Sequence, residues 1–448
     1  MLKKILSYGF FEGFSKGLNK LTILILPLFL STIGYGKIGL LISIEMVIPL
    51  ISLLGLERAV LRFYNDKVDF VNFSSTVSKT IIYTHALLLI LISSLYFLGW
   101  KMFFGLNVFP DLFLVIILIY FQGDILITFN KLRVEERHNE YFSGRLFFQV
   151  IKLLLVVAFI YLIGNYQGYL YGAIIAAFLT SLFFRTKISS FVKTGKKFSR
   201  ETFTTLFTFS WPFIFHGVAA NLLGNADKFI LEKYINLSQV GQYTLAYSYG
   251  SIMIFAFVGI SVFLEPLIYK EDVSSKRELL LNKFLFFTLI SGLIVYLLIA
   301  MSTEYLLPMI YNTSYHNVFS YIPLIAISYL VYPYYLKSNY KMIYEKKSMT
   351  IAVTSVSSAI LNISLNIIFI PLYGIYAAVF TTLICYILQS ILFVFISNRY
   401  RLNKELLEVL ILSIALIIIV YCNLNLYWST VVIIPFLFYN YFYKIKVQ

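Results

Sequence analysis

The sequence predicts an all-α polytopic membrane protein with about fourteen transmembrane helices, built as two six-helix repeats plus two C-terminal helices. The 448-residue chain is 60% apolar and only 13% charged, whereas a soluble protein carries about 25% charged residues. Fourteen spans of about 20 residues each would use about 280 residues, close to the whole apolar inventory. The lysines and arginines that give the net charge of +15 lie in small groups between the apolar runs. This positive-inside pattern predicts cytoplasmic termini and argues against a nucleic-acid partner.

The apolar runs predict the spans in chain order. The first helix is expected from Met1 to Tyr35, with an interruption at Pro27. A hydrophilic connection is expected at 131–145. The other spans are expected at about 38–56, 80–100 and 112–130, at 153–184 as two helices split by a turn at 164–168, at 203–271 as two, at 283–303, at 319–336, at 348–398 as two split at 371–374, and at 402–422 and 426–443.

The longest basic connection, residues 185–200, is expected to separate two halves. These are an N-terminal six-helix half at 1–190 and a C-terminal six-helix half at 203–398, with two additional helices at 402–443. Two short matches indicate a duplication: Gly39-Leu40-Leu41 with Gly241-Gln242-Tyr243, 202 positions later, and Gly168–Ala173 with Gly374–Ala378, 206 positions later. An even number of spans in each half predicts repeats that share one orientation and enclose a central cavity.

The sequence lacks the nucleotide-binding and metal-binding motifs that many enzymes carry. It has no phosphate-binding Gly-rich fingerprint, and its four histidines and two cysteines form no metal-ligand pattern. Cys385 and Cys422 both lie in apolar spans, where buried small hydrophobic residues are expected. We therefore expect no catalytic residue, no cofactor and no metal site. The absence of a long outer loop disfavours a glycan polymerase or ligase.

Charged side chains inside the apolar runs are the candidate functional residues, because they are costly in a bilayer. Glu12, Lys16 and Lys20 recur at four-residue intervals, so they share one face of a helix. This face could lie at the cytoplasmic interface with snorkelling lysines, or it could point into a cavity and meet an anionic headgroup. Arg58 and Arg62, at the end of the second span, could equally be cytoplasmic anchors.

The seventh span carries a small and polar stripe of Gly217, Asn221, Gly224 or Asn225, and Lys228, with Asp227 beside the lysine. Such a stripe is typical either of close helix packing through small residues or of a polar cavity wall. The accumulation of polar residues favours the wall. Whether Asp227 holds Lys228 or stabilises the fold stays open.

Other spans hold polar residues with two interpretations each. Asn362 shares a helical face with Ser358 and Asn366, which is typical of interhelical hydrogen bonding as much as of substrate contact. Glu45 and Asp124 could carry a proton or an ion, or could pair with a lysine. The candidate coupling residues are thus Glu12, Glu45, Asp124 and Asp227.

Several motifs resemble a known family. They are Asn225–Leu231, Val240–Tyr243 with Ala246-Tyr247, Pro266–Tyr269, and Leu361–Gly374 with Ala377-Ala378 after it. These motifs are similar to those of polysaccharide flippases, including Wzx-type O-antigen flippases, in the superfamily that also holds multidrug antiporters of the MATE type. The resemblance covers nearly the whole chain in topology, and distinct motifs cover about 225–269 and 358–380.

The resemblance implies a transporter and not an enzyme. It would turn a polyprenyl-diphosphate-linked oligosaccharide, such as an O-antigen (lipopolysaccharide) or capsule repeat unit, from the inner to the outer leaflet of a bacterial cytoplasmic membrane, alongside polymerase machinery. By this analogy the headgroup contacts would be Lys16, Lys20, Arg62 and Lys228, and the further substrate contacts Asn221, Asn225 and Asn362. A MATE-type drug/cation antiporter is the alternative, but fourteen spans and more helix-borne lysines than buried carboxylates favour the flippase.

Overall fold

The computed structural model describes residues 2–64, 70–187 and 198–421. Within these residues the chain is almost entirely helical, and the strands are the two-residue β1 (Met102–Phe103) and β2 (Leu106–Asn107), paired antiparallel. Ten segments of the described chain are long and apolar enough to cross a membrane. The prediction of an all-α polytopic membrane protein is therefore confirmed.

These ten segments correspond to the predicted second to sixth and eighth to twelfth spans. The predicted first, seventh and thirteenth spans are also helices, namely α1 (Leu2–Ile25), α8 (Arg200–Tyr234) and α17 (Lys404–Tyr421). The predicted fourteenth span and Cys422 lie outside the described residues. Cys385 is buried with a free thiol, as expected of a small core residue.

The chain forms two compact units. We call Leu18–Gly241 the first unit, and Met1–Gly17 together with Gln242–Gln448 the second unit. The units reflect packing, whereas the predicted halves 1–190 and 203–398 were divided at the longest basic connection, and the two divisions differ. Helix α8 belongs to the first unit because it packs on the second, third and fourth helices of the chain. The division into repeats stays a prediction.

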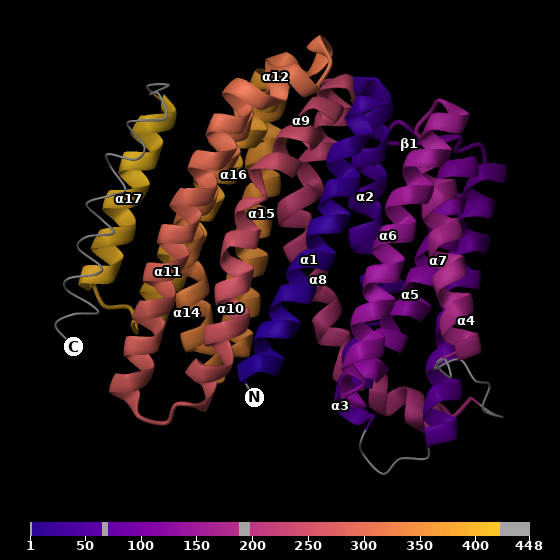
Figure 1. The fold of residues 1–448 in the computed structure, drawn as a ribbon, viewed down its shortest axis with the longest axis horizontal. Coiled ribbons are helices and arrows are strands. Elements are labelled where there is room, and N and C mark those ends of the chain that lie inside the picture. The colour runs from indigo at the N-terminus through magenta and orange to yellow at the C-terminus, as the bar shows by residue number, and fades with distance from the viewer. Residues whose placement is uncertain (1, 65–69, 188–197, 422–448) are drawn as a thin grey trace. The chain divides into compact units, whose positions relative to one another are not determined.

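The first unit is a helical bundle. Besides residues 18–25 of α1, α8 and the strands, it contains η1 (Leu26–Leu28), α2 (Thr32–Ser52), α3 (Leu56–Phe63), α4 (Phe70–Phe97), η2 (Val108–Leu112), α5 (Phe113–Val134), α6 (His138–Ile163), α7 (Gln167–Lys187) and the start of α9 (Leu237–Gly250). Helix α7 packs on α5 and α6, and these lie side by side in Figure 1. Helix α5 also contacts α2, α3 and α4, so it is central to the unit.

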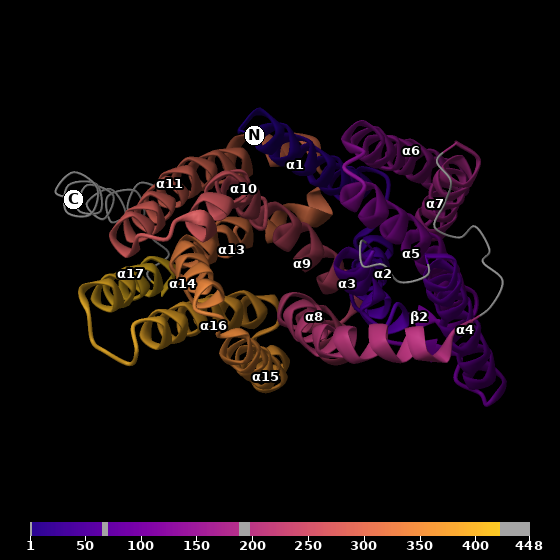
Figure 2. The same ribbon diagram turned by 90° about the horizontal axis from the view of Figure 1, so that it is seen from below.

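The second unit is a separate helical bundle. Besides residues 2–17 of α1, most of α9, and α17, it contains α10 (Met253–Lys270), α11 (Ser274–Met301), η3 (Ser302–Leu306), α12 (Leu307–Ile310), η4 (Thr313–Val318), α13 (Tyr321–Ser328), η5 (Tyr329–Val331), α14 (Tyr332–Tyr344), α15 (Ser348–Tyr373) and α16 (Ile375–Ser397). Helix α16 contacts α13, α14, α15 and α17, and Figure 2 shows it among them.

The first helix ends earlier than the sequence predicted. Helix α1 stops at Ile25, because Pro27 lacks the N–H that an α-helix needs and the chain turns through η1. The next helix then begins at Thr32 instead of about Ile38, since the Ser31 hydroxyl caps it by accepting the Gly34 N–H at 3.2 Å. The expected helix from Met1 to Tyr35 is therefore wrong at its end.

The predicted hydrophilic connection at 131–145 is also wrong, because helices α5 and α6 occupy nearly all of it. The turn between them is held by Glu135. Its carboxylate lies 3.3 Å from the Arg137 guanidinium and 4.0 Å from Lys131 Nζ, and it also accepts a hydrogen bond from the Tyr64 hydroxyl. Charged residues in this stretch suggested a loop, but here they neutralise one another and allow the helices to continue.

The two glycine turns predicted from sequence are confirmed. Gly164 ends α6 with φ +72°, and Gly374 separates α15 from α16 with φ +59°. Both glycines have a positive φ, where a residue with a side chain is strained.

An unexpected close contact joins α2 to the start of α9 inside the first unit. A Cβ atom on Gly36 would lie 2.1 Å from the Leu237 carbonyl oxygen, and one on Gly241 would lie 1.9 Å from the Thr32 carbonyl oxygen. The two contacts are equivalent in sequence. Gly241 follows Gly36 by 205 positions, and Leu237 follows Thr32 by the same 205 positions. Only glycine at both positions permits this crossing.

Candidate functional site

A buried lysine on α8 is the centre of the candidate site. Lys228 is 4% exposed, and its Nζ lies 2.8 Å from Asn225 Oδ1 and 3.4 Å from Ser43 Oγ on α2. The Ser43 hydroxyl in turn donates to the Gly39 carbonyl at 2.8 Å. Neutral oxygen atoms from two apolar helices therefore contact this ammonium group directly.

The neighbouring charges differ in sign and in position. Asp227 is buried, and its Oδ1 accepts the backbone N–H of Lys228 at 2.8 Å while its charge favours the lysine cation. Lys20, half-buried on α1, lies close enough to repel Lys228. The three side chains carry a formal charge of +1. An anion placed between the two ammonium groups would relieve their repulsion.

The rest of the polar stripe on α8 faces α2. Gly217 is packed against Leu50, and a Cβ there would lie 3.0 Å from that side chain. The Asn221 amide donates to the Gly217 carbonyl at 2.9 Å, and the Asn225 amide to the Asn221 carbonyl at 3.1 Å. The interpretation of close helix packing therefore holds at Gly217, whereas Asn225 and Lys228 form a buried polar cluster.

The candidates near the N-terminus lie in different environments. Lys16 is exposed and belongs to the second unit, whereas Lys20 belongs to the first. Glu12 is in the same continuous helix, but its side chain lies outside the described residues. The structure therefore brings Lys20 together with Lys228 and does not assign Lys16 or Glu12 to that cluster.

The arginines of α3 share an exposed face. Arg58 and Arg62 are both exposed, and the Arg62 guanidinium lies 5.2 Å from the centre of the Phe63 ring. Glu57, the acidic residue of this helix, is half-buried, and burial raises the pKa of its carboxyl group. This short helix therefore presents positive charge outward.

Glu45 pairs with a lysine, one of the two alternatives that the sequence left open. Its Oε2 lies 3.9 Å from Lys152 Nζ on α6 and accepts a hydrogen bond from the Gln122 amide at 3.3 Å. Both charged side chains are 8% exposed. The long distance indicates a loose buried pair.

Asp124 lies on α5 and is 5% exposed. It accepts a hydrogen bond from the Ser181 hydroxyl on α7. This bond joins two helices of the first unit.

Asn362 belongs to a chain of hydrogen bonds between α15 and α16. Its Oδ1 accepts the Asn366 amide at 3.0 Å, and Asn366 Oδ1 accepts the Thr381 hydroxyl. Asn362 is 1% exposed. Of the two interpretations, the geometry shows the interhelical hydrogen bonding.

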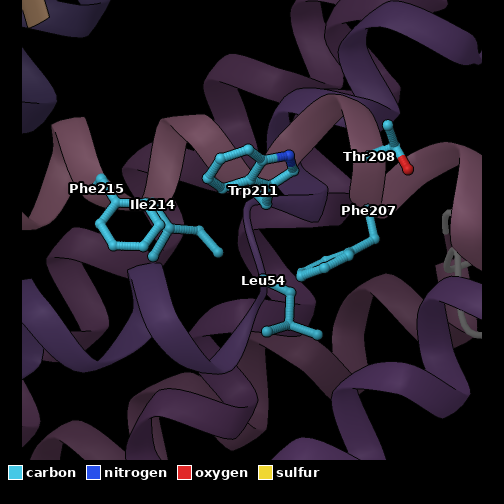
Figure 3. A pocket seen from close by; sticks show the side chains of 6 residues that line it. All are labelled: Leu54, Phe207, Thr208, Trp211, Ile214 and Phe215. Atoms are coloured by element: carbon cyan, nitrogen blue, oxygen red, sulfur yellow. The ribbon is translucent and has the colours of Figure 1, made fainter.

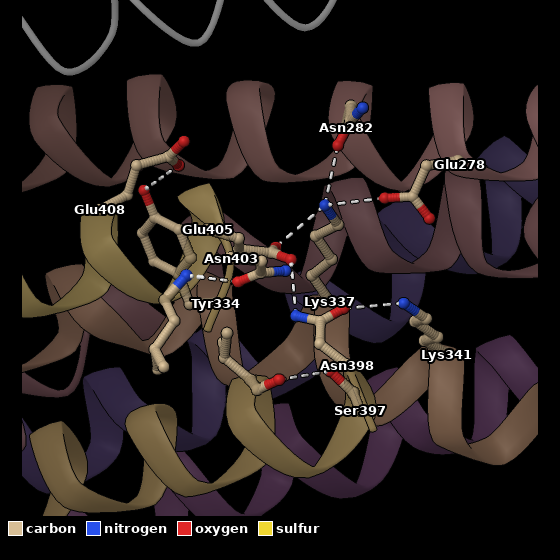
Figure 4. A network of polar contacts seen from close by, with 12 residues as sticks. Glu278, Asn282, Tyr334, Lys337, Lys341, Ser397, Asn398, Asn403, Glu405 and Glu408 are labelled. Atoms are coloured by element: carbon tan, nitrogen blue, oxygen red, sulfur yellow. Dashed lines mark hydrogen bonds and ion pairs between the residues drawn. The ribbon is translucent and has the colours of Figure 1, made fainter. Parts of the chain in front are cut away.

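Another buried lysine, on α14, was not singled out from the sequence. Lys337 on α14 is 3% exposed, and its Nζ lies 2.8 Å from Asn282 Oδ1 on α11 (Figure 4). It also lies 2.9 Å from Glu405 Oε1 on α17 and 3.3 Å from Glu278 Oε1 on α11. Its position just after an apolar span was the available signal, but its partners are 55 to 68 residues away.

The network around Lys337 continues along α17. Lys341 Nζ donates to Asn398 Oδ1 at 2.9 Å, and the Asn398 amide donates to Glu405 Oε2 at 3.3 Å (Figure 4). The Tyr334 hydroxyl donates to Glu408 Oε2 at 3.4 Å. These bonds fix α17 to the rest of the second unit.

No group of three or more histidine, cysteine or acidic side chains that could hold a metal ion occurs in the described ranges 2–64, 70–187 and 198–421. The polar clusters in these ranges contain side chains that can bind and orient a charged ligand or neutralise its charge.

An apolar helical bundle with buried lysines and carboxylates defines a polytopic membrane protein that holds charged groups among its helices. The model of the family described as "Polysaccharide biosynthesis protein" matches residues 1–268. The chain belongs to this family. Among proteins with curated descriptions, none matches the chain in sequence.

Solved structures of transporters share the fold. The lipid II flippase MurJ in an inward closed conformation is similar with a TM-score of 0.72 and 17% identity, covering 99% of this chain and 99% of that chain. An inward-facing multidrug resistance MATE family transporter of the MOP superfamily has a TM-score of 0.68 and 13% identity, covering 85% and 93%. The MATE multidrug transporter DinF-BH, solved as a complex, has a TM-score of 0.61 and 16% identity, covering 90% and 96%.

Proposed function

We propose that this protein is a flippase that turns a polyprenyl-diphosphate-linked oligosaccharide from the inner to the outer leaflet of a bacterial cytoplasmic membrane. The cargo would be an O-antigen or capsule repeat unit, as for Wzx-type proteins. Membership of the polysaccharide biosynthesis family supports the substrate class, and a fold shared with a lipid II flippase supports transport across the bilayer instead of an enzymatic reaction.

The observation that carries the proposal is the pair of lysines in the first unit. The ammonium group of Lys228 contacts the neutral side chains of Asn225 and Ser43, and it is repelled by Lys20. Like charges repel one another in a low-dielectric interior, and Lys20, Lys228 and Asp227 together keep a formal charge of +1. A diphosphate group carries the charge that would compensate both lysines, so the cluster suits an anionic headgroup.

We also propose four weaker contacts with the substrate, namely Lys16, Arg62, Asn221 and Asn362. Lys16 and Arg62 are exposed and could receive the headgroup before it reaches Lys228. The amide of Asn221 is bonded within its own helix, and Asn362 is buried between helices, so these two would contribute mainly to shape.

Alternating access would be the mechanism. The crossing of α2 with α9 at Gly36 and Gly241 would then be a contact that parts when the outer side opens. The neighbouring Thr32 and Ser238 hydroxyls, 2.8 Å apart, would break and re-form their hydrogen bond in each cycle. In this proposal the termini are cytoplasmic and polymerase machinery receives the product.

Loss of the gene tests the proposal. A strain lacking it should accumulate lipid-linked oligosaccharide that stays inaccessible to glycan-modifying reagents added outside spheroplasts. Restoring the gene should make this lipid accessible. Normal delivery to the outer face in the deletion strain, with no second transporter present, would contradict the proposal.

A MATE-type drug/cation antiporter is the second candidate, favoured by the buried carboxylates Glu45 and Asp124 and by the shared fold. It predicts cation efflux driven by an ion gradient and abolished by Glu45→Gln. A flippase predicts that lipid-linked oligosaccharide moves in proteoliposomes that contain no drug. The coupling ion, with Glu12 and Asp227 as further proposed carriers, would be identified by imposing one gradient at a time.

A further inference from the structure

An aromatic stripe runs along one face of α8 in the first unit. Phe203, Phe207, Trp211 and Phe215 recur at four-residue intervals, so they lie on one face over about 18 Å. The rings of Phe203 and Phe207 stack with centroids 5.7 Å apart, and those of Trp211 and Phe215 meet edge to face at 5.8 Å. Trp211 is 44% exposed and Phe215 is 65% exposed.

Three members of the stripe, Phe207, Trp211 and Phe215, form one wall of an apolar groove (Figure 3). The groove has a volume of about 470 Å³, which is within the range of ligand sites. Its lining consists of Leu54, Phe207, Thr208, Trp211, Ile214 and Phe215. Among these side chains only the Thr208 hydroxyl and the Trp211 indole nitrogen are polar, so the groove suits hydrocarbon.

The opposite wall is the turn between α2 and α3, which lies in close contact with α8. Leu54 and Gly55, between α2 and α3, both have left-handed backbone conformations, with φ of +52° and +68°. The Ser210 hydroxyl donates to the Leu54 carbonyl at 2.7 Å, and a Cβ on Gly55 would lie 2.7 Å from the Ser210 carbonyl oxygen. A left-handed leucine is costly, and the contacts with α8 hold it against the groove.

Positive charge lies next to this turn. Helix α3 begins directly after Gly55 and presents Arg58 and Arg62 to its exposed side. Phe63, beside Arg62, packs edge to face on Phe209 of α8 with ring centroids 5.2 Å apart. The arginines are thus tied to the same stretch of α8 that lines the groove.

We propose that this groove holds the isoprenoid chain of a polyprenyl diphosphate while Arg58 and Arg62 hold its phosphates. An apolar groove with cations on the helix that follows one of its walls complements a linear hydrocarbon with an anionic head. The inference deepens the proposed flippase function and rests on it. The predicted topology places the turn at the cytoplasmic end of the second span, which is the leaflet where the substrate would enter.

Photolabelling of the full-length protein tests the groove. The probe is a sugar-free polyprenyl diphosphate with a diazirine in its isoprenoid chain, added to nanodiscs of phosphatidylethanolamine and phosphatidylglycerol. We expect labelling of residues 203–215 that excess unlabelled polyprenyl diphosphate removes and excess phosphatidylglycerol does not. Labelling that both lipids remove equally would show an ordinary bilayer lipid there and would overturn the proposal, as would no labelling of this stretch.

Substitutions sharpen the test. The double variant Trp211→Ala, Phe215→Ala should lower labelling about tenfold, whereas Phe287→Ala, at a 48% exposed phenylalanine of α11, should leave it unchanged. Thr208→Trp, which fills the groove, should lower labelling as much. Wild-type labelling in both groove variants would overturn the proposal.

The headgroup end is tested by Arg58→Gln with Arg62→Gln. These changes should weaken labelling by the diphosphate probe and leave labelling by the matching polyprenol unchanged. If the groove variants flip lipid-linked oligosaccharide normally and are labelled normally, the proposed isoprenoid site is contradicted and the flippase function is supported. If labelling is specific but the wild-type protein flips no lipid-linked oligosaccharide, the isoprenoid site is supported and the proposed flippase function is contradicted.

Discussion

Lys337 and Lys228, two of the four lysines that are buried in the described part of the chain, have different surroundings. Lys337 in the second unit has three acceptors, two of which are carboxylates. Lys228 in the first unit has an amide and a hydroxyl as ammonium partners, and it is repelled by Lys20. Lys337 has two carboxylates as direct partners, whereas Lys228 has one nearby carboxylate, Asp227, and a second cation, Lys20, beside it. The difference separates a structural charge from a candidate binding charge.

The largest effect is expected for Lys337→Met. It removes three contacts and leaves Glu405 and Glu278 without their cation, which typically costs about 3–5 kcal/mol of unfolding free energy. Thermal unfolding in detergent measures the loss, with exposed Lys276→Met on α11 as the matched control. An unfolding temperature equal to that of the wild type would mean that the network contributes nothing to stability.

A smaller effect is expected for Gly36→Ala, because its Cβ would meet the Leu237 carbonyl oxygen at 2.1 Å. Forcing α2 and α9 apart should cost about 1–3 kcal/mol, as other overpacking does. Gly259→Ala is the control, since a Cβ there meets no atom within 4 Å and alanine favours the helix. Equal stability of the two variants would argue against a tight crossing.

Lys228→Met should lower stability less than Lys337→Met does, because relief of the repulsion from Lys20 offsets part of the lost interactions with Asn225, Ser43 and Asp227. Its affinity for polyprenyl diphosphate should fall about tenfold, or about 1.4 kcal/mol. Exposed Lys233→Met on the same helix should bind as the wild type does. An unchanged affinity of the Lys228 variant would assign this lysine to the fold alone.

The smallest effect is expected for the coupling of Lys20 with Lys228. If both lysines share one anion, the affinity losses of Lys20→Met and Lys228→Met should deviate from additivity by about 0.5–1 kcal/mol. A double-mutant cycle of polyprenyl diphosphate binding measures this term. Strict additivity would separate the two lysines into independent sites.

Apolar length predicted the architecture well, because each span must bury its backbone polar groups in its own helix. The glycine turns at Gly164 and Gly374 and the split spans around them were visible because glycine interrupts long apolar runs at these points. The boundaries of α5 and α6 were not, since charges such as Glu135 suggested a loop although they neutralise one another across the turn.

The candidate site was predicted in part. Helical spacing identified Asn225 and Lys228 as neighbours, because residues three apart meet on one helix face. The partners of Lys337 could not be found in this way, since Asn282 and Glu405 come from helices far away in sequence. The reciprocal contact of Gly36 and Gly241 was likewise missed, because the sequence match aligned Gly241 with Gly39, 202 positions earlier, and not with Gly36, 205 positions earlier.

The crossing of α2 and α9 has the geometry of a homodimer interface within a single chain. Gly36 meets the backbone of Leu237 in the same way that Gly241 meets the backbone of Thr32. A two-fold interface between identical subunits shows this reciprocity, in which each patch is its own partner. The duplication that the sequence predicts would account for this reciprocity, because each copy would contribute the same glycine contact.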